Sequence, residues 1–132
     1  MINKICVQTD QKTEVINVTE KISGMVRKEF DGLALFFVPH TTATLLMCED
    51  DDELRDDIVR TVDKWLSNCQ PFSHFRNNSP NAEAHILSAF GGNGITVAIE
   101  NGKINLGKYQ NILLLEMDGP KKREIRCKFI GS

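Results

Sequence analysis

The chain has 132 residues, of which 41% are hydrophobic and 26% charged, with a formal net charge of −2 and a pI of about 5.9. This size and composition are ordinary for one folded domain, so we expect a single domain over residues 1–132. The slightly acidic balance argues against broad binding to nucleic acid or anionic membranes. Apolar runs stay far below the roughly 20 residues of a membrane-spanning helix.

The cysteines and the N-terminus both bear on the cellular compartment. The four cysteines are scattered and form no CxxC pair; they are Cys6, Cys48, Cys69 and Cys127. Because three of them fall in strand-like segments, we expect buried free thiols in a reducing compartment. The N-terminus lacks the basic-then-apolar order of a signal peptide. The sequence therefore predicts a cytoplasmic protein.

The first thirty residues predict a hairpin followed by a helix. Strand-like residues at 2–9 and 15–19 flank a polar turn. Asn17 and Glu20 have the spacing of a capping box, and apolar residues then recur at helical spacing. We therefore expect a helix that ends near Phe30.

Segment 33–57 has the sequence pattern that is least expected of a segment with only a structural role. Its apolar beginning predicts a buried strand that ends at Pro39. His40 follows, then a hydroxyl-rich strand, and then an acidic block from Glu49 to Glu53 that suits the start of a helix. A fold that needed only a core has little reason to place a histidine and carboxylates at the two ends of one strand. The segment is therefore predicted to contribute to a site.

The next helix is expected to last to about Ser67. Its predicted apolar stripe consists of Leu54, Ile58, Val62 and Trp65. Arg55 falls inside this stripe, and a buried arginine requires a carboxylate or a bound anion. Two alternatives follow, a structural salt bridge, which we favour slightly, and a ligand contact.

The rest of the chain predicts a loop, a third helix and several strands. Residues 68–79 form the loop, which carries His74. Ser79 and Pro80 are typical of a helix start. The inner face of this helix is expected to hold Ala82, Ile86, Ala89 and Phe90, with His85 on its shoulder. Strands are then expected at 95–99, 103–106, 111–117 and 122–130, with a hairpin turn at Asn101-Gly102.

The histidines are the main candidates for chemistry. His40, His74 and His85 each lie beside a segment boundary, with Glu49 and Cys48 nearby in sequence. They could bind zinc or a similar ion, although no HxxxH or HExxH spacing is present. They could instead act as acid–base groups. A third alternative is phosphate binding, in which the additional candidates are Arg55, Thr41, Thr42, Lys121, Lys122 and Arg123.

Several motifs together resemble those of the small YjbQ-type proteins. His40-Thr41-Thr42-Ala43 with Glu49 and Asp52 is similar to the family's HTSA…NExxD motif. The family's Y-x-H motif, second histidine and G-x-S/T turn correspond to Phe72-Ser73-His74, His85 and Gly92-Asn93-Gly94. Its downstream signature corresponds to Gly102, Leu106-Gly107, Gln110, Glu116 and Asp118-Gly119-Pro120. The resemblance covers nearly the whole chain, and the motifs keep their order.

This resemblance implies an α+β fold with a β-sandwich core and about three helices, assembled as a homotrimer. Members are often labelled secondary thiamine-phosphate synthases, transferases that join a pyrimidine diphosphate to a thiazole phosphate. The shared polar positions carry over as catalytic candidates, namely His40, His74, His85 and Glu49, and the three histidines also as metal candidates. A divalent metal, zinc or magnesium, is the implied cofactor, although magnesium prefers oxygen ligands to histidines.

The sequence also departs from the family pattern near the expected site. Pro80 and Asn81 replace an acidic pair, Tyr109 replaces a tryptophan, and Cys48 replaces an asparagine. The loss of acids beside the site is expected to lower metal affinity or activity. Two functions remain open, an enzyme acting on phosphorylated small molecules and a non-catalytic trimeric module that binds a metal or an anionic metabolite.

Overall fold

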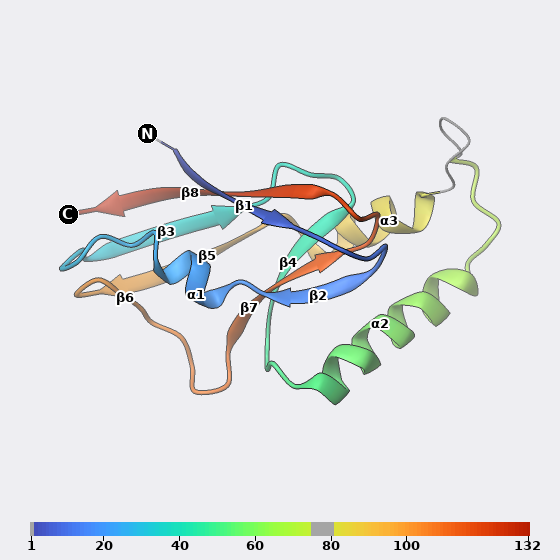
Figure 1. The fold of residues 1–132 in the computed structure, drawn as a ribbon, viewed down its shortest axis with the longest axis horizontal. Coiled ribbons are helices and arrows are strands. Elements are labelled where there is room, and N and C mark those ends of the chain that lie inside the picture. The colour runs from blue at the N-terminus through green and yellow to red at the C-terminus, as the bar shows by residue number, and fades with distance from the viewer. Residues whose placement is uncertain (1, 75–80) are drawn as a thin grey trace.

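The computed structural model describes residues 2–74 and 81–132. These residues form eight strands and three helices, which confirms the α+β class (Figure 1). The strands are β1 (Asn3–Gln8), β2 (Glu14–Asn17), β3 (Gly32–Phe37), β4 (Ala43–Cys48), β5 (Gly94–Glu100), β6 (Lys103–Ile104), β7 (Asn111–Glu116) and β8 (Lys122–Gly131). The helices are α1 (Thr19–Ser23), α2 (Asp52–Ser67) and α3 (Ala82–Gly91).

Two antiparallel sheets build the predicted sandwich. The larger has the strand order β1-β8-β3-β5-β6, and the smaller has the order β2-β7-β4. Inward side chains of both sheets share one apolar core, whose most deeply buried members include Phe36, Val38, Leu45, Ile112, Leu114 and Ile125. Burial of these side chains is the main force that holds the two sheets together.

A second apolar cluster lies on the other face of the small sheet. There β7 presents Leu113 and Leu115, which pack against Leu66 of α2 and Ala84 and Leu87 of α3. Strand β7 lies between β2 and β4 and is covered on both faces, which explains its continuous apolar sequence. The large sheet instead exposes alternate residues on its outer face, including Leu33 and Leu35 of β3.

The first helix is shorter in the structure than the sequence predicts. Helix α1 ends at Ser23, and the chain continues in turns to Phe30. The backbone N–H groups of Met25 and Val26 bond to carbonyls only three residues back, at 3.0 and 3.2 Å. The capping box is also wrong, because Asn17 Oδ1 accepts from the N–H of Thr19, at 2.9 Å, and caps no helix. Apolar side chains spaced three or four apart reach the core from turns as well, so spacing alone misled the prediction.

The register of α2 and α3 differs in part from the expected one. Of the predicted α2 stripe, Val62 faces the apolar cluster, whereas Trp65 is 45% exposed. In α3 the buried side chains are those of Ala82, Ala84, Leu87 and Ser88, and Phe90 is 73% exposed. The Trp65 and Phe90 rings contact each other edge to face, with centroids 5.6 Å apart. The expected start of α3 at Ser79-Pro80 lies outside the described residues.

The Asn101-Gly102 hairpin is confirmed. Asn101 has φ 49° and Gly102 has φ 77°, the left-handed backbone that a tight two-residue turn requires. Residues Glu100 and Lys103 pair directly across the turn. Asparagine and glycine tolerate this backbone better than other residues, so the dipeptide was a reliable local signal.

The cysteines are free thiols, as expected, but they are not uniformly buried. Cys127 is buried, and burial raises its pKa to about 12. Cys6 is exposed because it points to the outer face of β1, which corrects the expectation for that residue. Within the described residues, none of the helices combines the length and apolar character needed to cross a membrane.

Candidate functional site

A fully buried carboxylate lies at the end of β7. Glu116 Oε1 accepts hydrogen bonds from the Thr9 hydroxyl and from Arg123 Nε, both at 2.8 Å. Its Oε2 accepts from the backbone N–H groups of Met117 and Asp118, at 3.0 and 3.1 Å, and pairs with Arg123 Nη2. Burial raises the pKa of Glu116, but the hydrogen bonds from Arg123 and Thr9 outweigh it and hold the pKa below its ordinary value.

The Glu116–Arg123 pair fixes the loop between β3 and β4. Arg123 Nη2 donates to the hydroxyl of Thr42 at 2.8 Å and to its carbonyl at 3.1 Å. Arg123 is only 3% exposed, so this ion pair and its hydrogen bonds are shielded from water. The network thereby ties the residues before β4 to β7 and β8. We call Thr9, Thr42, Glu116 and Arg123 the buried polar network.

His40 lies in the loop that this network holds. Its Nε2 accepts a hydrogen bond from the backbone N–H of Glu124 at 2.9 Å. An accepting Nε2 carries no proton, so the neutral ring holds its proton on Nδ1. Burial, followed by the nearby charge of Arg123, lowers the pKa of His40 below 6.5. His40 is thus a half-buried, neutral imidazole near neutral pH.

The other two histidines contact each other. The ring centroids of His74 and His85 are 4.9 Å apart and their planes lie at 75°. His85 is half-buried on α3, and His74 is exposed in the segment after α2. The structure therefore brings together two of the three predicted histidines, which are eleven residues apart in sequence.

Helix α3 holds His85 close to the two turns that flank the buried polar network. Asn81 Nδ2, one turn before His85, donates to Asp118 Oδ2 at 3.1 Å. The Ser88 hydroxyl, one turn after it, donates to the carbonyl of Ala43 at 2.9 Å. Figure 1 shows α3 and the β3–β4 loop at the same end of the sandwich, where β8 begins. We call this region, with His40, His74 and His85, the histidine surface.

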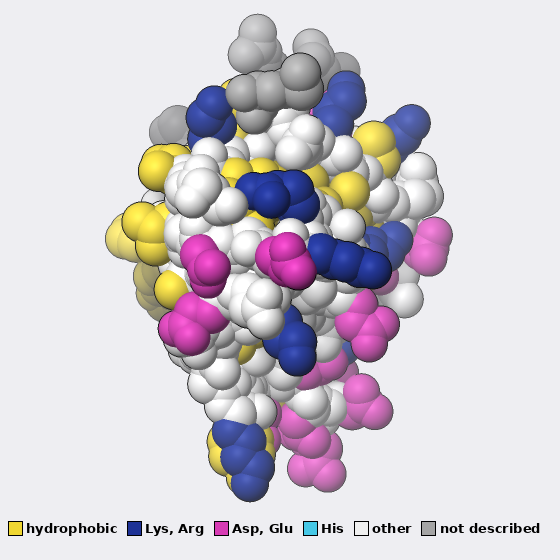
Figure 2. Space-filling view, turned by 90° about the vertical axis from the view of Figure 1, so that its left-hand side faces the viewer, with side chains coloured by type: hydrophobic (Ala, Val, Ile, Leu, Met, Phe, Trp, Pro, Cys, Tyr) yellow, Lys and Arg dark blue, Asp and Glu magenta, His cyan; other side chains and the backbone are white. Residues whose placement is uncertain are grey.

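The opposite end of the molecule has a different character. Figure 2 looks onto the end at which β8 finishes, and it shows basic, acidic and hydrophobic side chains mixed together. None of the three histidines, all of which belong to the described residues, appears on that face. The histidine surface is therefore restricted to one part of the molecule.

The remaining predicted site residues lie elsewhere or have structural partners. Glu49 is exposed after β4, and His40 precedes that strand, so roughly 20 Å of extended chain separates them. Thr41 is exposed, whereas Thr42 belongs to the buried polar network. Arg55 bonds Asp50 Oδ1 at 2.5 Å and the carbonyl of Val15 at 2.9 Å. The structure thus shows the favoured salt bridge for Arg55.

The fit of a metal can be judged from the available side chains. Residues 2–74 and 81–132 contain no group of three or more histidine, cysteine, aspartate or glutamate side chains arranged to hold a metal ion. The His74–His85 pair supplies two imidazoles, whereas zinc usually takes four ligands. Magnesium prefers oxygen ligands and does not suit this pair. The described residues of one chain therefore do not complete a site for either ion.

Sequence reasoning missed the buried polar network as a unit. The sequence indicated Glu116 only as part of the motifs shared with the family. It indicated Arg123 only as one of several basic residues that could bind phosphate. A signal was present, because Glu116 follows the apolar run of β7 and Arg123 lies in the buried row of β8, whose next members are Ile125 and Cys127. Such positions demand a partner, but the sequence does not show which strands become neighbours.

Comparison with known proteins agrees with this fold. A family model described as UPF0047 protein YjbQ-like matches residues 3–132. The chain belongs to the YjbQ/UPF0047 family. A UPF0047 protein of Archaeoglobus fulgidus is 35% identical over 125 residues, covering 95% of this chain and 98% of the relative. The YjbQ/UPF0047 protein YugU of Bacillus subtilis is 30% identical, covering 99% of this chain and all of the relative.

Solved structures of similar proteins have the same architecture. A crystal structure of a hypothetical protein from Aeropyrum pernix has a TM-score of 0.92 and 29% identity, covering 100% of this chain and 99% of the other. An uncharacterised YjbQ/UPF0047 protein from Clostridium acetobutylicum has a TM-score of 0.87 and 31% identity, covering 97% and 99%. The predicted YjbQ-like sandwich is thereby confirmed.

Proposed function

We propose that the chain is a cytoplasmic enzyme that acts on phosphorylated small molecules at the histidine surface. The observation that carries this proposal is the contact between His74 and His85, with ring centroids 4.9 Å apart on an anchored helix. His40, held in one tautomer by Glu124, is the third candidate. Together they offer imidazoles in different environments, which suits acid–base chemistry near neutral pH.

The charge around His40 supports an anionic substrate. The basic run Lys121, Lys122 and Arg123 immediately precedes Glu124, whose N–H binds His40. Arg123 is engaged in the buried polar network and Lys121 pairs with Asp118 at 2.8 Å, whereas Lys122 is exposed. Lys122 is therefore the residue of this run whose charge is available to a phosphate. Ammonium groups and imidazole N–H groups are suitable donors to phosphate oxygens.

The reaction that we propose to assay first is of the thiamine-phosphate synthase type. The nitrogen of a thiazole phosphate would form a bond to the methylene carbon of a pyrimidine diphosphate. The bond from that carbon to oxygen would break, and diphosphate would leave with the electron pair. A histidine can stabilise the departing diphosphate by donating a hydrogen bond or a proton.

The test compares His74→Ala and His85→Ala with the unmodified protein in that assay. We expect each substitution to abolish product formation and to leave the melting temperature nearly unchanged, because His74 is exposed and His85 is only half-buried. Thr61→Ala, an exposed position on α2, is the matched control. Unchanged activity in both histidine variants would refute the proposal.

The alternative is a non-catalytic trimeric module that binds a metal or an anionic metabolite. The paired imidazoles favour it, because two nitrogen ligands already lie together and a neighbouring subunit could add others. The test is the metal content of natively purified protein, compared with a variant in which His40, His74 and His85 are all alanine. Stoichiometric zinc that the variant loses, without any turnover, would favour this function over the enzyme.

We propose a homotrimer on the basis of the outer face of the large sheet. Leu33 and Ile130 are cross-strand neighbours on β3 and β8 and are 47% and 64% exposed, and Leu35 beside them is 40% exposed. Adjacent exposed apolar side chains on one sheet face are typical of association surfaces. His40 contacts Glu124 near the start of β8, whereas Leu33 and Ile130 pair near its end, so this association surface lies away from the histidine surface.

A further inference from the structure

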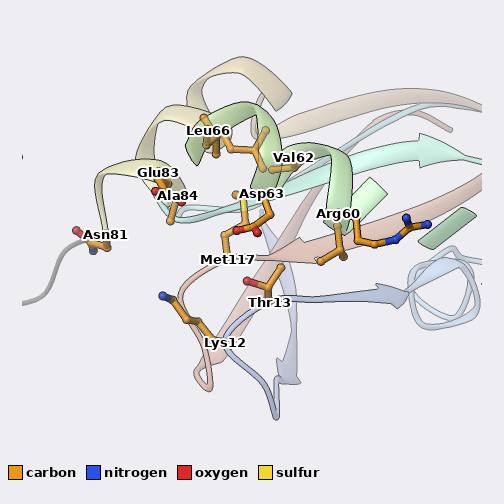
Figure 3. Close-up of a pocket in the computed structure, with 12 residues that line it drawn as sticks. Lys12, Thr13, Arg60, Val62, Asp63, Leu66, Asn81, Glu83, Ala84 and Met117 are labelled. Atoms are coloured by element: carbon orange, nitrogen blue, oxygen red, sulfur yellow. The ribbon is translucent and has the colours of Figure 1, made fainter. Parts of the chain in front are cut away.

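A cavity of about 260 Å³ lies between α2 and α3. The turn between β1 and β2 and the end of β7 complete its wall (Figure 3). None of the three histidines is among the described residues that line it. The cavity is therefore distinct from the histidine surface, and a ligand bound there goes beyond the proposed function.

The floor of the cavity is apolar. It is formed by side chains that also belong to the second apolar cluster, Leu66 and Val62 of α2, Ala84 and Leu87 of α3, and Met117. Four of these side chains are buried, those of Leu66, Ala84, Leu87 and Met117. The helices therefore keep a preformed apolar hollow. Its volume lies below the range of roughly 300–1,000 Å³ that is typical of drug-sized ligands. The cavity therefore suits an apolar group of about the size of one aromatic ring.

Two carboxylates from facing helices line this cavity, the exposed Asp63 and the half-buried Glu83. Figure 3 shows the side chains of Asp63 on α2 and Glu83 on α3 among the apolar lining residues. Within the described residues neither carboxylate takes part in an ion pair. Glu83 accepts a hydrogen bond from the neutral amide of Gln70, which does not compensate its charge.

The basic residues at the cavity do not cancel these charges. Arg60 pairs with Asp57 on the same helix, and Figure 3 shows its guanidinium directed away from the other lining residues, so only its aliphatic stem lines the cavity. Lys12 is exposed at the edge and contributes one positive charge against two carboxylates. The cavity thus combines an apolar floor with a net negative charge.

We infer that this cavity binds a small organic ammonium ion with an apolar body. Burying the apolar body would remove its surface and that of the floor from water, while the ammonium group would lie between Asp63 and Glu83. A divalent metal suits the site less well, because the described residues contain no third carboxylate, histidine or cysteine in a group with these two. An apolar anion would meet uncompensated negative charge.

The experiment titrates the full chain with phenethylammonium and, as the charge-reversed control, with phenylacetate. Binding is followed by NMR through the methyl resonances of Ala84, Leu87 and Met117. We expect phenethylammonium to shift these resonances at millimolar concentration and phenylacetate to bind at least tenfold more weakly. Asp63→Asn and Glu83→Gln should each weaken phenethylammonium binding by about threefold to fivefold, the effect of losing one partly exposed ion pair.

Glu53→Gln is the matched control variant, because Glu53 is an exposed acid on α2 that does not line the cavity. Its affinity for phenethylammonium should equal that of the unmodified protein, and equal melting temperatures would show that all variants are folded. Three results would overturn the inference: equal or tighter binding of phenylacetate, unchanged affinity in both cavity variants, or no methyl shift with either probe.

Discussion

At the scale of single residues, Glu116 combines complete burial with several hydrogen bonds. It accepts from Thr9, from Arg123 and from two backbone N–H groups, so both oxygens of its carboxylate are hydrogen-bonded. Removing one partner of a buried ion pair leaves the other charge without compensation, which is more damaging than losing an exposed pair. Because Arg123 also donates to Thr42, the pair holds the β3–β4 loop in place.

We expect Glu116→Gln to lower the free energy of unfolding at pH 7 by about 3–5 kcal/mol, because Arg123 would remain buried without a counter-charge. Since the pKa of Glu116 in the fold lies below its ordinary value of 4.5, its stabilising contribution is complete above pH 4.5 and is lost as the pH falls through the folded-state pKa. Urea unfolding at pH 7 and pH 3.5 measures both effects. Glu20→Gln, an exposed control on α1, should change neither; a loss below 1 kcal/mol in Glu116→Gln would contradict the assignment.

His40 provides a second prediction at this scale. Its accepting Nε2 and its lowered pKa require a neutral ring with the proton on Nδ1 at pH 7. Nitrogen-15 NMR of the imidazoles should show this tautomer and a pKa below 6.5, with His40→Ala assigning the resonance. The related stabilisation is present above pH 6.5 and is lost as the pH falls through the folded-state pKa. A ring that is already protonated at pH 7 would be incompatible with the Glu124 contact.

At the scale of elements, α3 links most of the features that matter for function. One face carries Ala84 and Leu87 into the second apolar cluster, and the neighbouring position carries His85. The hydrogen bonds of Asn81 and Ser88 hold the helix at both ends. A change of register in α3 would therefore displace the His74–His85 contact and the cavity together.

The register of α3 makes a direct prediction about two of its apolar residues. Leu87→Ala should lower the free energy of unfolding by about 2–4 kcal/mol, because it removes a buried side chain from the cluster. Phe90→Ala should cost less than about 1.5 kcal/mol, since that ring is 73% exposed and loses chiefly its contact with Trp65. Denaturant unfolding of the two variants decides between the observed register and the one expected from sequence, for which the order would be reversed.

At the scale of the whole molecule, the outer faces of the two sheets differ in their exposure to solvent. Helices α2 and α3 cover the small sheet, whereas the large sheet exposes Leu33, Leu35 and Ile130. Exposed neighbours of this kind are the feature on which the proposed trimer rests. The trimer would also explain why the two outward-facing residues of β3, Leu33 and Leu35, are leucines.

The trimer predicts a mass near three times the 14.9 kDa of the chain in light scattering coupled to size exclusion. Leu35→Lys should shift this mass to that of the monomer, because a charge would be buried in the interface. Thr61→Lys places the same charge on exposed α2 and should leave the trimer intact. A monomeric unmodified protein, or a trimer that Leu35→Lys does not disturb, would refute the use of this face.

The sequence by itself determined those features that depend on local patterns. Alternating or continuous apolar residues marked most of the strands, Asn101-Gly102 marked its hairpin, and ordered motifs marked the family. It misjudged the length of α1 and the inner face of α3, because side chains at helical spacing are buried only where a partner surface exists. These errors have one physical cause, since burial is decided by neighbours distant in the chain.

Only the tertiary structure decided how the functional candidates are grouped. It placed His74 against His85, paired Glu116 with Arg123, and gave Arg55 its partner in Asp50. It also opened the cavity between α2 and α3. Composition and spacing specify which side chains a chain possesses, but contacts between remote segments arise from the way the two sheets and the helices pack.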